Sequence, residues 1–592
     1  MLSVSRDASF VTLEAAKTLL ANRFGTHVSN ERFTDILKPW LVPRYFLGEH
    51  AVILKDDLIS ALDTMQASLF DDDTGFALLD NIKEKSIATS CVKIDIGADE
   101  EQSSPGFFAA CSNLLRARCN DAKKTSFGLG ETRSYIGSSR VAATDSEILK
   151  LVERQQRTLA EISRSRASQF ANSAYYMGSK KLLSPFLVEA IFAVADGKTR
   201  VVDLMCGSGS AAGAFSHFWP TYASDAQGFC QRLAQVQGGG FTRSRAATLL
   251  EQISVAAHRN IEQLRSLTFG LVEREDRIFH GEFGPETLAS YREFCESVPI
   301  YPDVSRIGDW CPSALVNSRH SSFKEEPFVL CTAYFANVYF GFRQAIEIDS
   351  IRFAAEQLPD ALDRDWVLGA LVTTMSAVAL TYAGHFAQPL IRSASDISES
   401  NLGRILERRA MSVMHEFSMR LLNLAEESER SKFSITPLPG PWKRALALLD
   451  DGAAEKTVVY VDAPYTRDEY SRYYHVLETI CEYKYPSSSG AARIPSKRSG
   501  ERFRSEFFTR SKDRMKNALV DVIGSILQRD FVCAWSYSDN GVVDPVEVID
   551  MVTRKYGNRL QSFATPYSHK AQGGSRQKLI TEYLVLFIPK HF

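Results

Sequence analysis

The sequence lacks any cluster of cysteines and histidines. Its ten Cys residues are scattered through 592 residues, with no C-x-x-C pair and no grouping with His. This excludes a disulfide framework and a zinc site, so the cysteines are expected to be reduced and mostly buried. No metal is expected in this protein.

A strong charge of either sign is also missing. The formal net charge is −2, which excludes a wholly basic nucleic-acid coat but leaves room for a local basic channel. The longest uncharged run, 366–384, is about one membrane span long, but it is rich in Ala and four Thr or Ser residues interrupt it. The N-terminus has no signal-peptide core. We therefore expect a buried helix at this run, no membrane partner and a cytoplasmic location.

The first 95 residues have the pattern of a small separate unit. Helical spacing over 12–21 is followed by a second helix from Asn30, a hairpin over Tyr45–Leu54 and a closing helix. This order resembles the winged helix of excisionase-type DNA-binding modules, and a helical packing domain is the alternative. Residues 96–165 have loop-like composition and are interpreted as a connector.

From about residue 166 the pattern becomes that of an α/β protein. An amphipathic helix over 182–194 precedes a short apolar strand, a glycine-rich turn and a second strand that ends at Asp225. This order begins a parallel sheet. Further strands are predicted near 458–461, 531–537 and 582–588. Between them, residues 226–455 are interpreted as a mainly helical insertion, with helices over 246–267, 344–362, 366–383 and 402–428.

The glycine-rich turn reads D-L-M-C-G-S-G-S-A-A-G. Asp203 closes the strand, and Gly207, Gly209 and Gly213 follow it. The third glycine is one residue late for the dinucleotide fingerprint. Glycines here let a ligand approach the backbone at the carboxyl edge of a sheet, and Asp225 could accept two ribose hydroxyls. The pattern favours a nucleoside-containing cofactor, and a tight helix–strand turn is the alternative.

The opposite end of the sheet region contains V-V-Y-V-D-A-P-Y, in which a strand runs into Asp462. A carboxylate oxygen and the carbonyl of Ala463 can accept both hydrogens of an exocyclic amine. Pro464 would fix that carbonyl inward, and Tyr465 offers a face for a flat base. Such hydrogen bonds localise the nitrogen lone pair and prepare the amine to act as a nucleophile.

A third motif, Y-M-G-S-K, precedes the sheet at Tyr176, Gly178 and Lys180. A near-copy, Y-I-G-S-S-R, lies at Tyr135–Arg140. The later copy is preferred because it leads directly into the amphipathic helix and the glycine strand.

Taken in this order, the three motifs resemble the Dam-like (D12-class) adenine-specific DNA methyltransferases over roughly residues 172–592. The resemblance implies a Rossmann-like sheet and S-adenosylmethionine as the methyl donor. It assigns the cofactor site to Tyr176, Gly178, Lys180, Asp203, Cys206, Gly207, Gly209 and Asp225. It assigns the catalytic motif to Asp462, Ala463, Pro464 and Tyr465, followed by an aromatic and acidic stretch at Tyr473, Tyr474, His475 and Glu478.

The resemblance further implies methylation of adenine N6 in double-stranded DNA, with the inserted helices as the target-recognition region and the base flipped out of the duplex. A restriction endonuclease or another defence protein would be the natural partner. The chain departs from the family at Ala463, where a first Pro is usual; the carbonyl is retained but rigidity is lost. Two alternatives stay open: an RNA adenine methyltransferase, and a catalytically weak DNA-binding regulatory protein.

The segment 492–516 is basic, with nine Lys or Arg residues against three acids. Beside an active site it would suit phosphate contacts, for which we select Arg498, Arg502 and Arg504. A solvated helix face is the alternative.

Two further patterns are weaker. F-A-N-V-Y-F-G, 335–341, is either a substrate-facing loop or packing. Asp468 with Glu482 and Lys484 spells a nuclease-like pattern, but the segment around Glu482 is predicted to be a helix rather than the core strand that a nuclease needs.

Overall fold

The computed structural model describes most of the chain from residue 176 onward and a few strands before it. The described residues are 10–12, 44–47, 50–54, 94–96, 176, 179–281, 284–320, 324–382, 384–450, 456–464, 469–496, 500–538, 541–570 and 577–590. Contacts divide the chain into two units, Met1–Cys91 with Gln102–Gln156, and Val92–Glu101 with Arg157–Phe592. Each unit has a sheet of its own.

The sheet of the first unit is antiparallel. Its strands are β1 (Phe10–Thr12), β2 (Arg44–Leu47) and β3 (His50–Leu54), in the order β1-β3-β2. The predicted hairpin over Tyr45–Leu54 is therefore confirmed. The predicted helices of the winged-helix interpretation and nearly all of the 96–165 connector lie outside the described residues.

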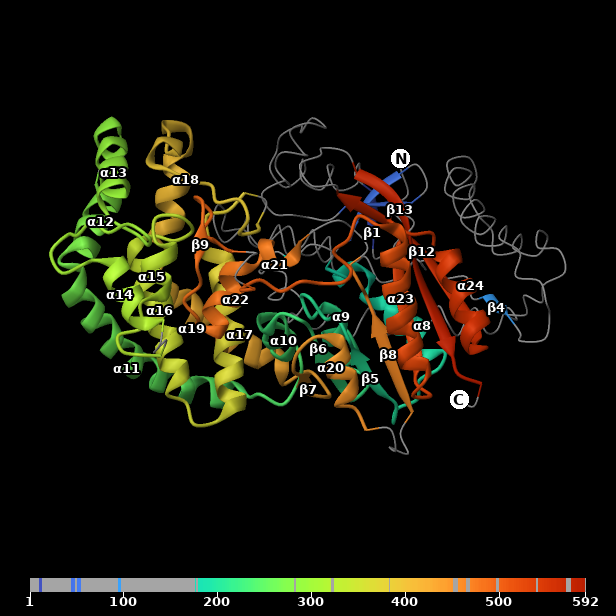
Figure 1. The fold of residues 1–592 in the computed structure, drawn as a ribbon. Helices are drawn as coiled ribbons and strands as arrows, with labels where there is room; N and C mark the ends of the chain where they lie inside the picture. The colour runs from blue at the N-terminus through green and yellow to red at the C-terminus, as the bar shows by residue number, and fades with distance from the viewer. Residues whose placement is uncertain are drawn as a thin grey trace, which may run out of the picture. The chain divides into compact units, whose positions relative to one another are not determined.

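The second unit contains an eight-stranded sheet with the order β4-β12-β13-β11-β8-β5-β6-β7 (Figure 1). Neighbouring strands from β11 to β7 are parallel, whereas β4, β12 and β13 pair antiparallel at one side. The bounds are β4 (Ile94–Ile96), β5 (Arg200–Asp203), β6 (Thr221–Ser224), β7 (Ile435–Leu438), β8 (Thr457–Val461), β11 (Val532–Ser538), β12 (Arg559–Lys570) and β13 (Gln577–Ile588). This confirms the α/β class.

The central strands are apolar because helices cover the sheet. Every residue of β5, β8 and β11 is buried, as expected of parallel strands covered on both faces. The helices around them are α8 (Ser184–Phe192), α9 (Ser210–Phe215), α10 (Gly228–Gln235), α20 (Trp442–Ala447), α23 (Lys512–Leu527) and α24 (Pro545–Tyr556). The prediction of a helix over 182–194 is confirmed by α8, but the helix is buried on nearly all sides rather than amphipathic.

The strand order places a switch point between β5 and β8. From β5 the chain continues to β6 and β7 on one side, and it later returns through β8 and β11 on the other. In open α/β sheets, ligands bind at the carboxyl ends of the strands where the order reverses. A ligand would therefore be expected to bind near the residues that follow β5 and β8.

The region between β6 and β7 is mainly helical. Its first helix is α10, described above, and further helices follow it. They are α11 (Arg243–Thr268), α12 (Leu271–Phe279), α13 (Pro285–Ser297), α14 (Pro312–Arg319), α15 (Leu330–Phe335), α16 (Phe342–Glu356), α17 (Ala361–Val378), α18 (Glu399–Ala410) and α19 (Val413–Ser428). Figure 1 shows α11 to α19 gathered at one side of the sheet.

Three boundaries differ from the prediction. The proposed insertion, 226–455, also contains β7, a strand of the main sheet. Its Pro437 weakens the strand pattern in the sequence and is tolerated because β7 is at the sheet edge. The single helix expected over 402–428 is two helices, because Ser412 caps a new start by accepting the His415 N–H. The helix expected over 344–362 ends at Glu356.

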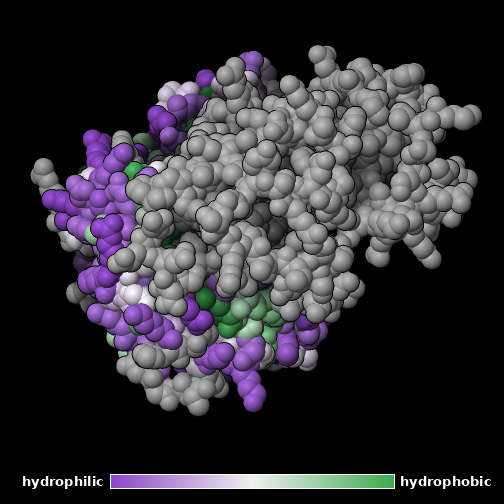
Figure 2. All heavy atoms as spheres, turned by 90° about the vertical axis from the view of Figure 1, so that its right-hand side faces the viewer, coloured by the Kyte–Doolittle hydropathy of each residue, from purple (hydrophilic) through white to green (hydrophobic). Residues whose placement is uncertain are grey.

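The long uncharged run lies mainly in α17, whose residues from Trp366 to Met375 are buried. Trp366 stacks on Phe241, with ring centroids 4.1 Å apart. Within the described residues, no helix has the length and apolar character needed to cross a membrane. On the face shown in Figure 2 the described residues are mostly hydrophilic, with hydrophobic residues exposed in one small region.

Candidate active site

The carboxyl ends of three adjacent parallel strands each lead into an aspartate. Asp203 ends β5, Asp225 follows β6, and Asp462 follows β8. In the sheet register Asp203 pairs with Ala223 of β6 and Tyr460 of β8. The structure thus brings the acids of two predicted motifs, 259 residues apart in the chain (462 minus 203), to one edge of the sheet.

The turn after Asp203 requires its glycines. Gly207 and Gly209 have φ angles of +50° and +75°, in the left-handed region. A Cβ on Gly207 would lie 2.6 Å from the Tyr176 ring, and one on Gly209 would lie 2.4 Å from the Ala234 Cα atom. The tight turn itself therefore requires these glycines, whether or not it also binds a ligand.

Asp225 holds this turn in place. Its Oδ2 accepts the Gly207 N–H at 3.0 Å, and its Oδ1 accepts the Gln227 N–H at 3.0 Å. Burial raises the pKa of this carboxyl, and hydrogen bonds from the Gln227, Gly207 and Ala226 backbone and from the Cys230 side chain oppose the rise. The carboxylate therefore serves first as the acceptor that fixes the turn.

Asp203 is fully buried, and only one of its two carboxylate oxygens accepts a hydrogen bond among the described residues. Its Oδ2 accepts the Ala212 N–H at 3.1 Å, whereas its Oδ1 has no hydrogen-bond partner among the described residues. Burial, together with the nearby charge of Asp462, raises the pKa of Asp203 well above its usual value. A buried acceptor without a partner costs about 1–3 kcal/mol, so this oxygen marks a place where a ligand donor would be stabilising.

Tyr176 forms part of the wall beside the glycine turn. Its ring stacks on Tyr474 with centroids 4.7 Å apart and planes 8° apart, and Tyr470 lies 5.6 Å away. The Cys230 thiol donates to the Tyr176 hydroxyl at 3.9 Å. Cys206 is also buried, and its thiol donates to the Cys230 carbonyl at 3.7 Å. Gly178 and Tyr465 lie outside the described residues.

Lys180 lies beside the predicted catalytic carboxylate. Its Nζ is 3.0 Å from Asp462 Oδ1 and 3.4 Å from Glu582 Oε1, and both Lys180 and Glu582 are buried. Burial raises the pKa of Asp462 to about 6; Glu582 adds to the rise and Lys180 opposes it. Sequence reasoning missed Glu582, although an acid within the apolar run T-E-Y-L-V-L-F was a signal for it.

The helices after the predicted catalytic motif connect this edge to the helix that follows β6. They are α21 (Tyr470–Tyr473) and α22 (His475–Glu482). Glu478 accepts the Gly228 and Phe229 N–H groups, each at 3.0 Å, and so caps the N-terminus of α10. Burial raises the pKa of Glu478 to about 7. The acid of the predicted aromatic and acidic stretch therefore connects α22 to the start of α10.

His475 connects the same helices to the inserted region. Its Nε2 lies 3.2 Å from the Phe386 carbonyl and 3.4 Å from the Tyr339 hydroxyl. Burial lowers the pKa of His475 to about 3, so the ring is neutral at physiological pH. Phe335, Tyr339 and Phe340 are fully buried, which agrees with the packing interpretation of 335–341.

An ion pair connects the basic segment to the residues that follow the predicted catalytic motif in the chain. Arg502, whose side chain is 9% exposed, pairs with Glu469 at 3.2 Å. A short hairpin of β9 (Ser488–Ser489) and β10 (Ile494–Pro495) overlaps the start of the basic segment, and Glu501 accepts the Ser487 N–H at 2.8 Å. Arg504 is exposed, and Arg498 lies outside the described residues. Of the three selected arginines, Arg502 is therefore already engaged in an internal ion pair.

Two other arrangements do not provide an active site. The nuclease-like pattern fails because Glu482 ends α22 and Tyr483 takes a left-handed conformation, so no strand is formed there. No group of three His, Cys, Asp or Glu that could hold a metal occurs in the part of the chain that the structure describes.

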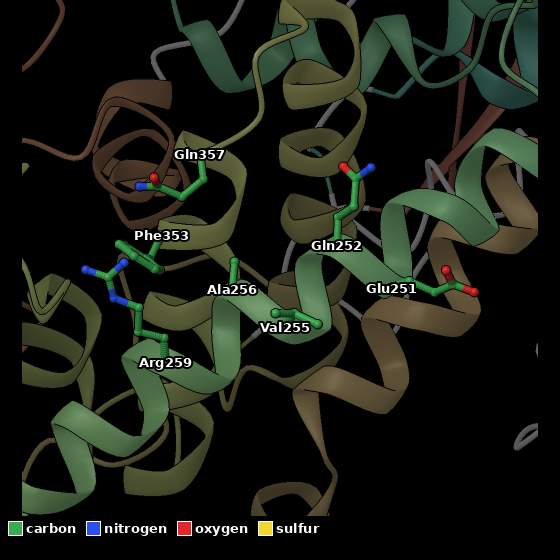
Figure 3. Close-up of a pocket in the computed structure, with 7 residues that line it drawn as sticks. All are labelled: Glu251, Gln252, Val255, Ala256, Arg259, Phe353 and Gln357. Atoms are coloured by element: carbon green, nitrogen blue, oxygen red, sulfur yellow. The ribbon is translucent and has the colours of Figure 1, made fainter.

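A hollow of about 600 Å³ lies elsewhere, on α11 and α16 (Figure 3). Its lining residues are Glu251, Gln252, Val255, Ala256, Arg259, Phe353 and Gln357. Arg259 pairs with Glu326 at 2.5 Å, outside this set, and its guanidinium lies over the Phe353 ring. None of the predicted site residues lines this hollow.

In comparisons with known proteins, no family model and no curated protein matches the chain.

Proposed function

We propose that this protein transfers the methyl group of S-adenosylmethionine to N6 of adenine in double-stranded DNA. The observation that carries the proposal is the shared edge of β5, β6 and β8. There, a glycine turn with two acids stands beside a D-A-P-Y motif. A nucleoside cofactor and a target amine would both be bound at this one edge.

The residues present fit the cofactor. Asp225 lies at the end of β6 beside the glycine turn, where it could accept ribose hydroxyls, and Asp203 Oδ1 has no hydrogen-bond partner among the described residues. Burial raises the pKa values of Asp203, Asp225 and Asp462, so these carboxylates would be stabilised by a cationic ligand. Bound S-adenosylmethionine supplies an electrophilic methyl group on a positively charged sulfur.

The same edge suits an exocyclic amine. Asp462 and the carbonyl of Ala463 would accept its two hydrogens, and Lys180 favours the ionised form of Asp462 that can accept. The nitrogen lone pair would form the new bond to the methyl group, the electron pair of the cofactor's S–CH₃ bond would stay on sulfur, and the proton that the nitrogen loses would pass to Asp462 and from there to solvent. An acceptor at Asp462 stabilises the positive charge that develops on that nitrogen.

The reversed strand β13 between β11 and β12 is the arrangement expected of a Rossmann-like methyltransferase sheet, and it supports the finer fold assignment. Helices α11 to α19 would then be the target-recognition region. The base has to be flipped out because its amine lies within the stacked duplex, and extrusion costs a few kcal/mol. Tyr465 is proposed to stack on the flipped adenine.

The direct test is methyl transfer by the full chain. Purified protein is incubated with methyl-labelled S-adenosylmethionine and with duplex DNA, single-stranded DNA or RNA, and the digested products are identified by mass spectrometry. We expect N6-methyladenine from duplex DNA. Label only in RNA, only in N4-methylcytosine, or in no nucleic acid would overturn the proposal; the last result is the one expected of a regulatory protein.

Neutralising Arg498 and Arg504 together is expected to lower DNA affinity and flatten its salt dependence. For duplex DNA, the log–log salt slope should fall by about 0.9 for each arginine–phosphate pair that is removed, without a change in the preferred sequence. Fluorescence anisotropy from 50 to 200 mM salt measures this slope.

The matched control is Arg554→Gln with Lys555→Gln, which removes two cations from the end of α24. It should leave the slope unchanged. An unchanged slope in the Arg498→Gln, Arg504→Gln protein would mean that the segment does not contact phosphates. Arg502 is left intact because it already pairs with Glu469 within the protein.

A further inference from the structure

Glu582 is a buried carboxylate near the predicted catalytic residue Asp462. It lies on β13 and is 1% exposed, and its Oε1 accepts the Ser536 hydroxyl at 3.1 Å and lies 3.4 Å from Lys180 Nζ. Burying a charge costs folding free energy unless a partner compensates it, and a hydrophobic residue of similar volume is often at least as stable. Its position therefore invites a functional explanation.

Lys180 connects two strands that are not neighbours. Asp462 follows β8, whereas Glu582 is on β13, and β11 lies between these strands. The Lys180 ammonium group reaches both, contacting Asp462 at Oδ1 and Glu582 at Oε1. An ammonium group has three donors, and with no second carboxylate it could close onto both oxygens of Asp462.

We propose that Glu582 is a positioning residue for Asp462. By sharing Lys180, it holds the ammonium group on Oδ1 and leaves Oδ2 to accept the target amine. This inference rests on the proposed methyl transfer and deepens it, because it specifies which oxygen of the catalytic carboxylate is kept for the substrate. Neither Glu582 nor Ser536 is assigned a role by the resemblance in the sequence.

The charges around Asp462 provide a test of the proposal, because Glu582 and Lys180 shift the pKa of Asp462 in opposite directions. The groups that face it are Lys180 from the segment before α8, Glu582 from β13, Asp203 from β5 and Tyr460 from β8. Glu582 raises the pKa of Asp462 and Lys180 lowers it. Methyl transfer needs the ionised carboxylate, so activity should fall as pH drops through about 6.

The pH range over which kcat falls is the acidic limb of the pH–rate profile. In Glu582→Gln this limb should move to lower pH, because a negative charge near Asp462 is removed. In Lys180→Met it should move to higher pH. Above the limb, kcat of Glu582→Gln should fall about 10- to 100-fold through misplacement of Lys180, with little change in the KM for S-adenosylmethionine. Glu582→Asp retains the charge and should restore the parent limb, with part of the rate.

If Glu582 had only a structural role, Glu582→Gln would lower the amount of folded protein but would not shift the acidic limb. Glu275→Gln, which alters a buried carboxylate that caps α16, is the control and should not move it. The proposal is overturned if Glu582→Gln and Lys180→Met move the limb in the same direction, or if neither moves it.

A second measurement separates this inference from the proposed function. The folded-state pKa of Asp462 is raised above its unfolded value of 3.8, so its contribution to stability is present below pH 3.8 and is lost as pH rises through about 6. Thermal unfolding between pH 3.5 and about 8 follows that loss without any methyl transfer. If the parent transfers no methyl group, the proposed function fails; if Glu582→Gln also leaves this pH dependence unchanged, the inference fails as well.

Discussion

Replacing Asp462 by Asn is expected to abolish methyl transfer while S-adenosylmethionine still binds. The amide cannot supply the negative charge that stabilises the developing cation on the amine, and removing one such interaction costs about 10²-fold or more in kcat. Asp462 contacts Lys180 rather than the glycine turn, so calorimetry should show cofactor affinity within a few-fold of the parent. Activity within a few-fold of the parent would remove Asp462 from the catalytic role.

Asp349 provides a matched control for this substitution. It is a fully buried aspartate, and burial raises its pKa to about 6, as it does for Asp462. Both of its oxygens are occupied, by the Cys331 and Thr332 N–H groups at 2.8 Å and by the Tyr483 and Thr332 hydroxyls at 2.7 Å. Asp349→Asn should therefore lower the unfolding temperature and leave kcat unchanged.

The opposite pattern is expected for Asp462→Asn. In Asp462→Asn the amide oxygen can still accept from Lys180, which also keeps its contact with Glu582. The fold should therefore lose less stability than in Asp349→Asn, where four hydrogen bonds are affected. A residue whose removal destroys activity at a smaller loss of stability serves the reaction rather than the fold.

The sheet and the strand-end acids could be predicted from the sequence because their signals are local. Apolar runs that end at Asp203 and Asp462, and a strand that ends at Asp225, specify both the strand and the edge on which its acid lies. The hairpin over Tyr45–Leu54 was predictable for the same reason. The order of motifs along the chain then suggested one shared site before any contact was known.

What the sequence could not supply depends on distant pairing. The strand β7 is four residues long and contains Pro437, so its pattern is too weak to separate it from a helical insertion. Helical periodicity likewise says nothing about which carboxylate caps which helix. Glu275 caps α16, Asp349 caps α15 and Glu478 caps α10, all from other elements.

The role of Lys180 shows the same limit within the site. The resemblance assigns it to the cofactor motif, and the structure places its ammonium group between Asp462 and Glu582. The three residues are far apart in the sequence, so only the sheet order brings them together. A Lys near a glycine motif cannot by itself reveal which carboxylate it serves.

Replacing Asp225 by Ala is expected to weaken S-adenosylmethionine binding before it affects DNA binding. A charged hydrogen bond is worth about 1.5–3 kcal/mol, so removing the hydrogen bonds to the ribose should raise the Kd by about 10-fold or more. The substitution also removes the acceptor of the Gly207 and Gln227 N–H groups, and the fold should lose stability with it. Cofactor affinity alone would therefore not separate a direct contact from damage to the turn.

Glu275→Ala separates the two effects. Glu275 is likewise buried, and its carboxylate also accepts two backbone N–H groups, from Phe342 at 2.8 Å and Arg343 at 2.9 Å, but it lies in the helical region. Both variants should lose stability to a similar extent, and Asp225→Ala alone should lose cofactor affinity. Asp225→Asn, which keeps an acceptor for one N–H group, should recover stability but not the full affinity, because an amide oxygen is a weaker acceptor for two hydroxyls. Equal calorimetric affinity in Asp225→Ala and Glu275→Ala would place the ribose elsewhere and leave Asp225 as a support for the glycine turn.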